Sequence, residues 1–269
     1  METQKESVQP ISPPTPTPSS NSTQIPGVLA IVQNALAFYK SRWKTFLGIS
    51  LIPFVLGYAI FFLLELASAA LREPLENNLI AWAFVILLAV PFLMIIGVWQ
   101  FLATVFVIKD RQEEIGVKGA YKRAWSKIKS SIWISFLSSL VIFAGFLLLI
   151  VPGIIFSVWF NFSTYVLVDE GLTGLEAMKK SKEYVKGKFW AIVWRFLGFG
   201  LFSFGIFFGF FLLLIIPGII FILISPKLAE ILGGIVYTGA SFVYAPLVII
   251  YSYLVYQGLK ISKSQPIDG

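Results

Sequence analysis

Cysteine and histidine are both absent from this chain of 269 residues. Without cysteine, the chain forms no disulfide, offers no thiolate to a metal and has no thiol nucleophile. Without histidine, it lacks the commonest metal ligand and the commonest general base. Charged residues are scarce as well, at 13% of the chain, about half of what an ordinary globular domain carries. We therefore expect no catalytic residue, no cofactor and no metal site.

Apolar residues take the place of the missing charge. They make up 57% of the chain, with 26 phenylalanines, and the mean hydropathy is +0.83. A transmembrane helix needs about 20 mostly apolar residues. The composition predicts an all-α, multi-pass transmembrane helical bundle of about six spans, at 45–71, 79–108, 131–151, 153–168, 190–216 and 231–256.

The segment 131–168 is the one whose number of crossings is open. Its 38 residues contain no charge. As a single helix they would reach about 57 Å at 1.5 Å per residue, nearly twice the roughly 30 Å hydrocarbon core. Two short crossings with a turn at Pro152 and Gly153 fit better, because proline and glycine pre-set successive turn angles. The alternative is one kinked and strongly tilted helix.

Basic residues gather on one side of the predicted spans. Of 21 lysines and arginines, 12 lie in two loops, at 109–129 and 179–188. Because cytoplasmic loops are enriched in lysine and arginine, we expect both termini and both loops in the cytoplasm, with Arg72 and Lys227 on the other side. The net charge of +7 could suggest a nucleic-acid partner. The distribution of the basic residues predicts none, because they lie beside apolar spans, where lipid head groups are the nearer anion.

An eleven-residue apolar sequence occurs twice in the chain. Residues 146–156 read FLLLIVPGIIF and residues 211–221 read FLLLIIPGIIF, with ten identical positions. The basic segments 120–133 and 177–190 also align, and both end on a tryptophan. We interpret this as an internal repeat, in which each unit is a basic amphipathic helix followed by a membrane hairpin. We expect the two Pro-Gly pairs to be structurally equivalent.

The basic segments at 117–130 and 174–187 are too short and too charged to span a bilayer, but each carries an apolar stripe. Such helices lie in the membrane interface, with the apolar face toward the acyl chains. Trp133 and Trp190 then mark bends into the following spans, because indole rings prefer the interface. We expect anionic lipid to bind the basic side chains of Lys122, Arg123, Lys179, Lys180, Lys182 and Lys186.

The domain organisation follows from the same patterns. Residues 1–26 contain six prolines with serine, threonine and glutamine, too polar to bury a core, so we expect a disordered cytoplasmic tail. Residues 261–269 form a short C-terminal tail. The rest is a single membrane domain over 27–260, with units at about 27–110, 117–168 and 174–260.

The segment from Pro152 to Trp190 reads PGIIFSVWFNFSTYVLVDEGLTGLEAMKKSKEYVKGKFW. Its Pro-Gly-apolar phrase, acidic-glycine connection at 169–171, lysine-containing helix start at 177–181 and aromatic pair at 189–190 resemble a prokaryotic integral membrane family. This family is the membrane domain of glycerophosphoryl diester phosphodiesterases, with its uncharacterised relatives. The resemblance covers residues 27–260 and implies a protein of the prokaryotic cytoplasmic (inner) membrane. It implies no phosphodiesterase activity, because the soluble catalytic domain and its histidine are absent.

Four residues with charged or amide side chains lie inside the predicted spans. An intramembrane carboxylate is a functional-site candidate by default, which applies to Glu65, unless this side chain simply reaches the interface near Arg72. We expect Arg195 to extend to the cytoplasmic head groups, and Gln100 and Asn161 to form interhelical hydrogen bonds. Glu65 and Arg195 lie toward opposite faces of the bilayer and should not pair.

Three functions remain open. The lack of chemical groups and the basic cytoplasmic helices favour a non-catalytic integral membrane protein, a scaffold or an accessory factor in envelope or lipid homeostasis. The internal repeat favours a transporter or lipid-moving protein instead, because repeated halves build sites near the membrane midplane. A polar cavity lined by Gln100, Asn161 or Glu65 would support this second function. An enzyme is least favoured, since Glu65 would be its sole intramembrane carboxylate.

Overall fold

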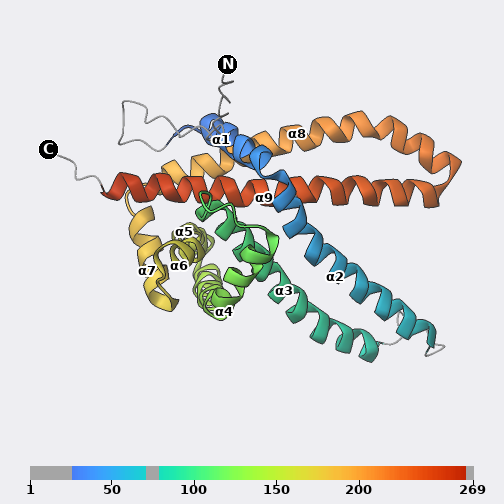
Figure 1. Cartoon of the computed structure of the whole chain (residues 1–269), viewed down its shortest axis with the longest axis horizontal. Helices are drawn as coiled ribbons and strands as arrows, with labels where there is room; N and C mark the ends of the chain where they lie inside the picture. Colours follow the sequence, from blue (N-terminus) through green and yellow to red (C-terminus); the bar gives the residue numbers. More distant parts are fainter. Residues whose placement is uncertain (1–25, 71–78, 265–269) are drawn as a thin grey trace, which may run out of the picture.

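The computed structural model describes residues 26–70 and 79–264, and these are almost wholly helical, with no strand among them (Figure 1). The prediction of an all-α fold is therefore confirmed. The predicted N-terminal tail lies outside the described residues except for Pro26, whereas residues 261–264 of the predicted C-terminal tail belong to α9, which corrects that boundary. The helices are α1 (Val28–Ser41), α2 (Trp43–Ala70), α3 (Leu79–Lys109), α4 (Val117–Leu148), α5 (Ile150–Phe160), α6 (Ser163–Glu170), α7 (Gly174–Val185), α8 (Phe189–Ile224) and α9 (Pro226–Ser264).

Six stretches are long and apolar enough to cross a membrane: Trp43–Ile60, Ala89–Lys109, Val117–Leu148, Ile150–Glu170, Phe189–Ile224 and Pro226–Ser264. This confirms a multi-pass helical membrane protein. The predicted end of the fifth span at residue 216 is wrong, because α8 continues through Pro217 to Ile224. Proline removes one backbone donor from the ladder, and in apolar surroundings the remaining groups have no better partners than the helix itself.

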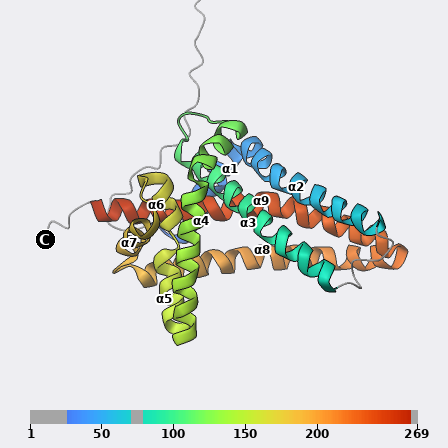
Figure 2. The same ribbon diagram turned by 90° about the horizontal axis from the view of Figure 1, so that it is seen from below.

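The long helices form three antiparallel hairpins that diverge from a common end (Figures 1 and 2). We call the pairs α2–α3, α4–α5 and α8–α9 the three arms. In Figure 1 the α4–α5 arm is seen end-on, and Figure 2 shows it running away from the other two. The helices therefore do not form a bundle that is packed along its whole length.

The core lies where the arms meet, a region that we call the junction. It is built from α1, α6, α7, the N-terminal parts of α2, α4 and α8, and the C-terminal ends of α3 and α9. Alanines 103, 120, 124 and 177 are fully buried there, and such small side chains allow helices to approach closely. The large side chains that fill the remaining space include Phe46, Leu102, Phe162, Leu167, Tyr251, Tyr253 and Tyr256.

The segment 131–168 forms two crossings, α4 and α5, as expected, but the turn lies at Leu149 and not at Pro152 and Gly153. Leu149 is extended, with φ −166° and ψ 154°, and Pro152 lies in the first turn of α5, where no backbone donor is needed. Gly153 lies against Gly145 of α4, because a Cβ added at Gly145 would be 3.1 Å from the Gly153 Cα. The two helices therefore touch at this glycine pair, and their contact fixes the hairpin.

The second copy of the apolar phrase has a different structure, so the predicted equivalence of the two Pro-Gly pairs is wrong. Pro217 and Gly218 lie inside α8, and the chain turns only at Ser225. An added Cβ at Gly218 would have no atom within 4 Å. The residue that corresponds to Gly145 is Phe210, whose ring prevents the close approach that the first copy makes. The two copies therefore differ at the residue that makes the close helix contact in the first copy.

The two basic segments also differ. The predicted bend at Trp133 is wrong, because α4 continues unbroken from Val117 to Leu148. In the second copy, α7 ends at Val185 and α8 begins at Phe189, so the chain does turn next to Trp190. Gly187 allows this turn with φ +84°, and the aligned position in the first copy is Ser130.

Candidate functional site

Two adjacent carboxylates, Asp169 and Glu170, lie at the C-terminal end of α6 in the junction. Gly171, with φ +78°, ends the helix directly after them. Anionic groups at a helix C-terminus are disfavoured by the helix dipole, so this arrangement needs compensation. The side chains are 14% and 17% exposed. Water therefore solvates the two carboxylates only in part, and protein groups must supply the rest of the stabilisation.

Asp169 and Glu170 accept hydrogen bonds from three tyrosines. The hydroxyls of Tyr253 and Tyr256 on α9 each donate to Asp169 at 3.2 Å. Glu170 accepts from Tyr184 of α7 at 2.8 Å and lies 2.7 Å from the Tyr256 hydroxyl, whose single proton the two carboxylates share. Since the donors come from two helices, the pair ties α6 to both α7 and α9.

Lysines neutralise the same helix end. Lys260 forms an ion pair with Asp169, and its Nζ lies 3.8 Å from Glu170. Lys109 of α3 donates from Nζ to the Val168 carbonyl at 2.7 Å. A cation at a helix C-terminus is favourable, so four helices converge on one polar cluster, which we call the α6 clamp: Lys109, Asp169, Glu170, Tyr184, Tyr253, Tyr256 and Lys260.

The α6 clamp holds its groups in structural roles. Burial, and then the hydrogen bond to Glu170, raises the pKa of the Tyr184 hydroxyl above its ordinary value. Each carboxylate carries at least two donors, and neither faces the large cavity described below. Apart from the Asp-Glu-Gly triplet, no local pattern indicated this cluster, because its members lie up to 151 positions apart, from Lys109 to Lys260.

Ion pairs join the loop after α3 to α4. Arg123 pairs with both Asp110 and Glu113. Its guanidinium, proposed from sequence as a lipid contact, is thus engaged by two carboxylates of the protein. The side chain is 40% exposed, so these pairs contribute little stability, but they orient the loop against α4.

The apolar stripes of the two basic segments cover protein, which corrects the prediction that they face acyl chains. Ala120, Tyr121 and Ile128 of α4 are buried mainly against α3, and Met178 and Tyr184 of α7 are buried in the junction. Each segment does have an apolar stripe, as predicted, but the stripe packs against the apolar surface of the junction. The lysines on the opposite faces remain exposed.

The proposed lipid-contacting lysines occupy several environments. Lys122, Lys179 and Lys186 are exposed. Lys180 lies 3.2 Å from Glu183, and Lys182 lies 4.1 Å from the ring centroid of Trp159. Lys122 and Lys118 also flank a small cavity of about 420 Å³, whose other lining residues are Ile52, Trp99, Val117, Tyr121 and Trp125.

The polar residues predicted inside the spans do not come together. Gln100 lies 3.5 Å from the Ser50 hydroxyl of α2, a long hydrogen bond between two helices. Asn161 is exposed at the break between α5 and α6, so the prediction of a buried amide there is wrong. The side chain of Glu65 lies outside the described residues, and its role and its separation from Arg195 stay predictions.

Arg195 contacts protein backbone, and whether its side chain also reaches the head groups stays a prediction. Its Nε donates to the Pro26 carbonyl at 3.1 Å, directly before α1, and its Nη1 donates to Ala191 at 2.8 Å. The Tyr251 hydroxyl donates to the Arg195 carbonyl at 2.9 Å. Arg195 therefore positions the start of α1 against α8 and α9.

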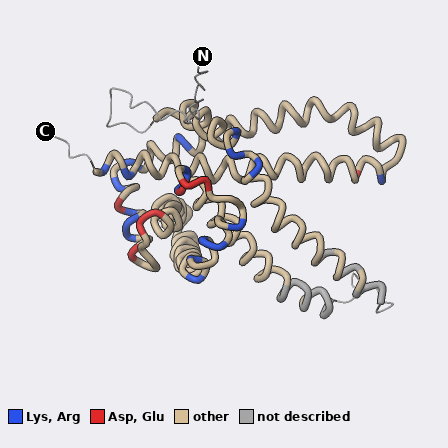
Figure 3. The backbone as a smooth tube through the Cα atoms, in the orientation of Figure 1, with Lys and Arg blue, Asp and Glu red and all other residues tan. Residues whose placement is uncertain are grey.

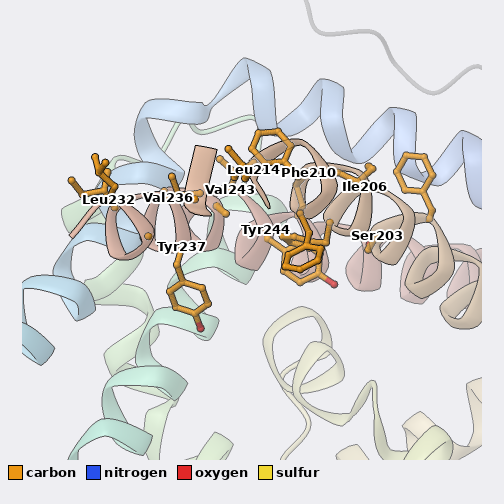
Figure 4. Close-up of a pocket in the computed structure, with 18 of the residues that line it drawn as sticks. Ser203, Ile206, Phe210, Leu214, Leu232, Val236, Tyr237, Val243 and Tyr244 are labelled. Atoms are coloured by element: carbon orange, nitrogen blue, oxygen red, sulfur yellow. The ribbon is translucent and has the colours of Figure 1, made fainter. Parts of the chain in front are cut away.

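A cavity of about 1040 Å³ lies between α8, α9 and one face of α1 (Figure 4). Its lining is apolar, with the hydroxyl-bearing side chains of Ser203, Tyr237 and Tyr244 and no charged residue among the described residues. Figure 4 shows Ile206 and Phe210 of α8 and further side chains of α9 at this space. Neither Gln100 nor Asn161 lines this cavity, so the polar cavity predicted from the sequence is not found among the described residues.

This cavity opens to the surroundings of the protein, since several of its lining residues are exposed, among them Phe210 at 55% and Ile235 at 63%. Sequence analysis missed it because its small residues, Gly218, Gly233, Gly239 and Ala240, lie on two helices whose relative placement is set by distant packing.

Among the described residues, no group of three or more acidic side chains could hold a metal ion. Comparison of the chain with protein-family models, with curated proteins and with solved structures gave no match. The family resemblance of the segment from Pro152 to Trp190 therefore stays a prediction.

Proposed function

We propose that the protein is a non-catalytic integral membrane protein that acts as a scaffold or accessory factor in envelope or lipid homeostasis. The observation that carries the proposal is the separation of charge from apolar surface. Charged residues gather at the junction, while the arms are nearly free of them (Figure 3). A charged, hydrogen-bonded junction that holds apolar hairpins apart is suited to organising lipid or partner proteins around it.

We further propose that the junction lies at the cytoplasmic face of a prokaryotic cytoplasmic membrane. The basic residues of 109–129 and 179–188 support this orientation. The N-terminal helix α1 and the C-terminal end of α9 also lie at the junction (Figure 1). Both termini are then cytoplasmic, and Lys227 at the end of the α8–α9 arm is on the opposite side.

Anionic lipid is the proposed partner of the junction. Each lysine near a membrane surface contributes about 1 kcal/mol to the attraction of anionic lipid. Lys118 and Lys122 are the strongest candidates, because they flank a cavity lined by Trp99 and Trp125, and indole rings favour the depth of the head groups. Lys179 and Lys186 extend the same basic surface on α7.

A lipid-moving protein is the alternative, and the cavity between α8 and α9 is the observation in its favour. An enzyme has less support, because the carboxylates of the α6 clamp are held by tyrosines and lysines.

Deletion of the gene followed by mass spectrometry of the membrane lipids tests the proposed function. We expect a changed phospholipid or envelope composition that is restored by the full chain. An unchanged composition under growth and envelope stress would contradict the proposal.

A further inference from the structure

The cavity between α8 and α9 has a shape that limits what can occupy it. The two helices meet at the turn at Ser225 and diverge between that turn and the junction (Figure 1). At the junction end α1 packs across both, and a Cβ added at Gly198 of α8 would lie 3.1 Å from Val28 of α1. The space is therefore bounded lengthwise at both ends.

Water is a poor occupant of this space. Apolar cavities stay dry because a buried water needs two to four polar partners. The lining supplies three hydroxyl-bearing side chains and, among the described residues, no charged one. Only hydrocarbon gives the rings and branched side chains of the lining the dispersion contacts that a void would forfeit.

A helix from a second protein fits this space less well than a single hydrocarbon chain does. A membrane-spanning helix about 10–12 Å across and about 30 Å long occupies roughly 2,400–3,400 Å³. This is two to three times the cavity volume of about 1040 Å³. The cavity instead lies at the upper end of the range of about 300–1,000 Å³ that is usual for small-molecule sites.

We propose that this cavity binds the acyl chain of a membrane phospholipid, which lies lengthwise between α8 and α9. The inference rests on the proposed membrane function and assigns it a lipid site. The lining residues of α8 run from Phe199 to Phe221, about 33 Å at 1.5 Å per residue, which is long enough for a fully extended chain. Since the lining carries no charge, the chain and not the head group is recognised, in contrast to the anionic lipid proposed for Lys118 and Lys122.

Two glycines of α9 provide a matched pair of variants. Gly239 lines the cavity and Gly234 does not, and an added Cβ at either position would have no atom within 4 Å. Gly239→Phe should fill the cavity, whereas Gly234→Phe makes the same change of residue in the same helix without filling it. Ala240→Phe, at a second lining position, is an independent filling variant should Gly239→Phe fail to fold.

The experiment measures lipid retained by the full chain. Each protein is reconstituted with palmitoyl-oleoyl phosphatidylcholine or phosphatidylglycerol, transferred to detergent, checked by gel filtration and circular dichroism, and analysed by native mass spectrometry. We expect the wild type and Gly234→Phe to retain phospholipid of either head group. The folded filling variant should retain about tenfold less, the equivalent of about 1.4 kcal/mol.

Equal retention by the filling variant and Gly234→Phe would overturn the proposal, as would a wild type that retains no phospholipid. Those outcomes are distinct from failure of the proposed function, which the lipid composition of the deletion strain reports separately. If the deletion strain has a changed lipid composition but the filling variant and Gly234→Phe retain equal amounts of lipid, the proposed site is wrong and the proposed function stands.

Discussion

The C-terminal half of α3 and the helix α8 are both apolar in sequence, yet they are packed in different ways. In the most apolar stretch of α3, which ends in the junction, 44% of the residues are buried inside the protein, and in that of α8 none is. The junction has small residues that let helices touch. The α8–α9 arm has phenylalanines and a cavity in the equivalent place. Hydropathy therefore locates membrane helices but does not show which of them pack on protein.

Tyrosine and phenylalanine mark the same contrast. In the junction, the hydroxyls of Tyr121, Tyr251 and Tyr256 all have acceptors within 3.0 Å. In α8, the rings of Phe204, Phe208 and Phe211 are 64%, 49% and 59% exposed. Buried hydroxyls need partners, so they specify a unique packing, whereas exposed rings accept any hydrocarbon that surrounds them.

The largest expected effect compares the two glycines of the repeated phrase. Gly153→Ala places a methyl group against the Phe146 ring at the α4–α5 contact, and such overpacking costs about 1–3 kcal/mol. Gly218→Ala meets no neighbour and should stabilise the helix by about 0.5–1 kcal/mol. Unfolding of both variants in mixed micelles, followed by circular dichroism, measures the difference. Equal effects would mean that the two phrases are packed alike after all.

Loss of one hydroxyl from the α6 clamp should have a somewhat smaller effect. Tyr256→Phe removes the donor that Asp169 and Glu170 share, and leaving buried acceptors short of partners costs about 1–3 kcal/mol. The control is Tyr237→Phe, since Tyr237 is 78% exposed, and a surface change of this kind stays within about 0.5 kcal/mol. Denaturation midpoints that fall equally for both would show that the clamp contributes nothing.

The lysines that flank the small cavity test the lipid partner. Replacing Lys118 and Lys122 with glutamine should lower the preference for spin-labelled phosphatidylglycerol over phosphatidylcholine by about fivefold per lysine, as about 1 kcal/mol each implies. Lys127 and Lys129 on the same helix, outside the cavity lining, are a charge-matched control. The difference should shrink at high salt, because exposed charges are screened. If the control variant lowers the preference for phosphatidylglycerol equally, only net charge matters, and Lys118 and Lys122 act as topology signals and not as a lipid site.

The smallest expected effect is a pH dependence. Burial and Glu170 raise the pKa of Tyr184 above its ordinary value of 10.0, so above pH 10 the unfolded phenol loses its proton while the folded one keeps it. Stability should therefore be fully present below pH 10 and fall as the pH rises above it. Tyr184→Phe should fall less steeply than the wild type between pH 10 and 11. If the stability of Tyr184→Phe and of the wild type, measured by chemical denaturation, falls equally with pH, ionisation of Tyr184 is not coupled to folding.

The sequence predicted the helical class, the six spans and the hairpin at 131–168, because these depend on local composition and length. It did not predict the break at Leu149, which depends on contact between Gly145 and Gly153, or the unbroken α4. The α6 clamp was missed for the same reason, since Asp169 and Lys260 meet only in the folded chain. The apolar stripe of α7 was correctly seen, but no local pattern reveals whether such a stripe faces lipid or protein.

The orientation of the junction is the most direct test of the account. Because the chain has no cysteine, Lys179→Cys in α7 and Lys227→Cys at the end of the α8–α9 arm each introduce a single thiol, and both positions are exposed. A membrane-impermeant maleimide is applied to intact cells and to inverted vesicles. We expect the cysteine at 227 to react in intact cells and the cysteine at 179 to react only in inverted vesicles. Reaction of the cysteine at 179 in intact cells would contradict the account.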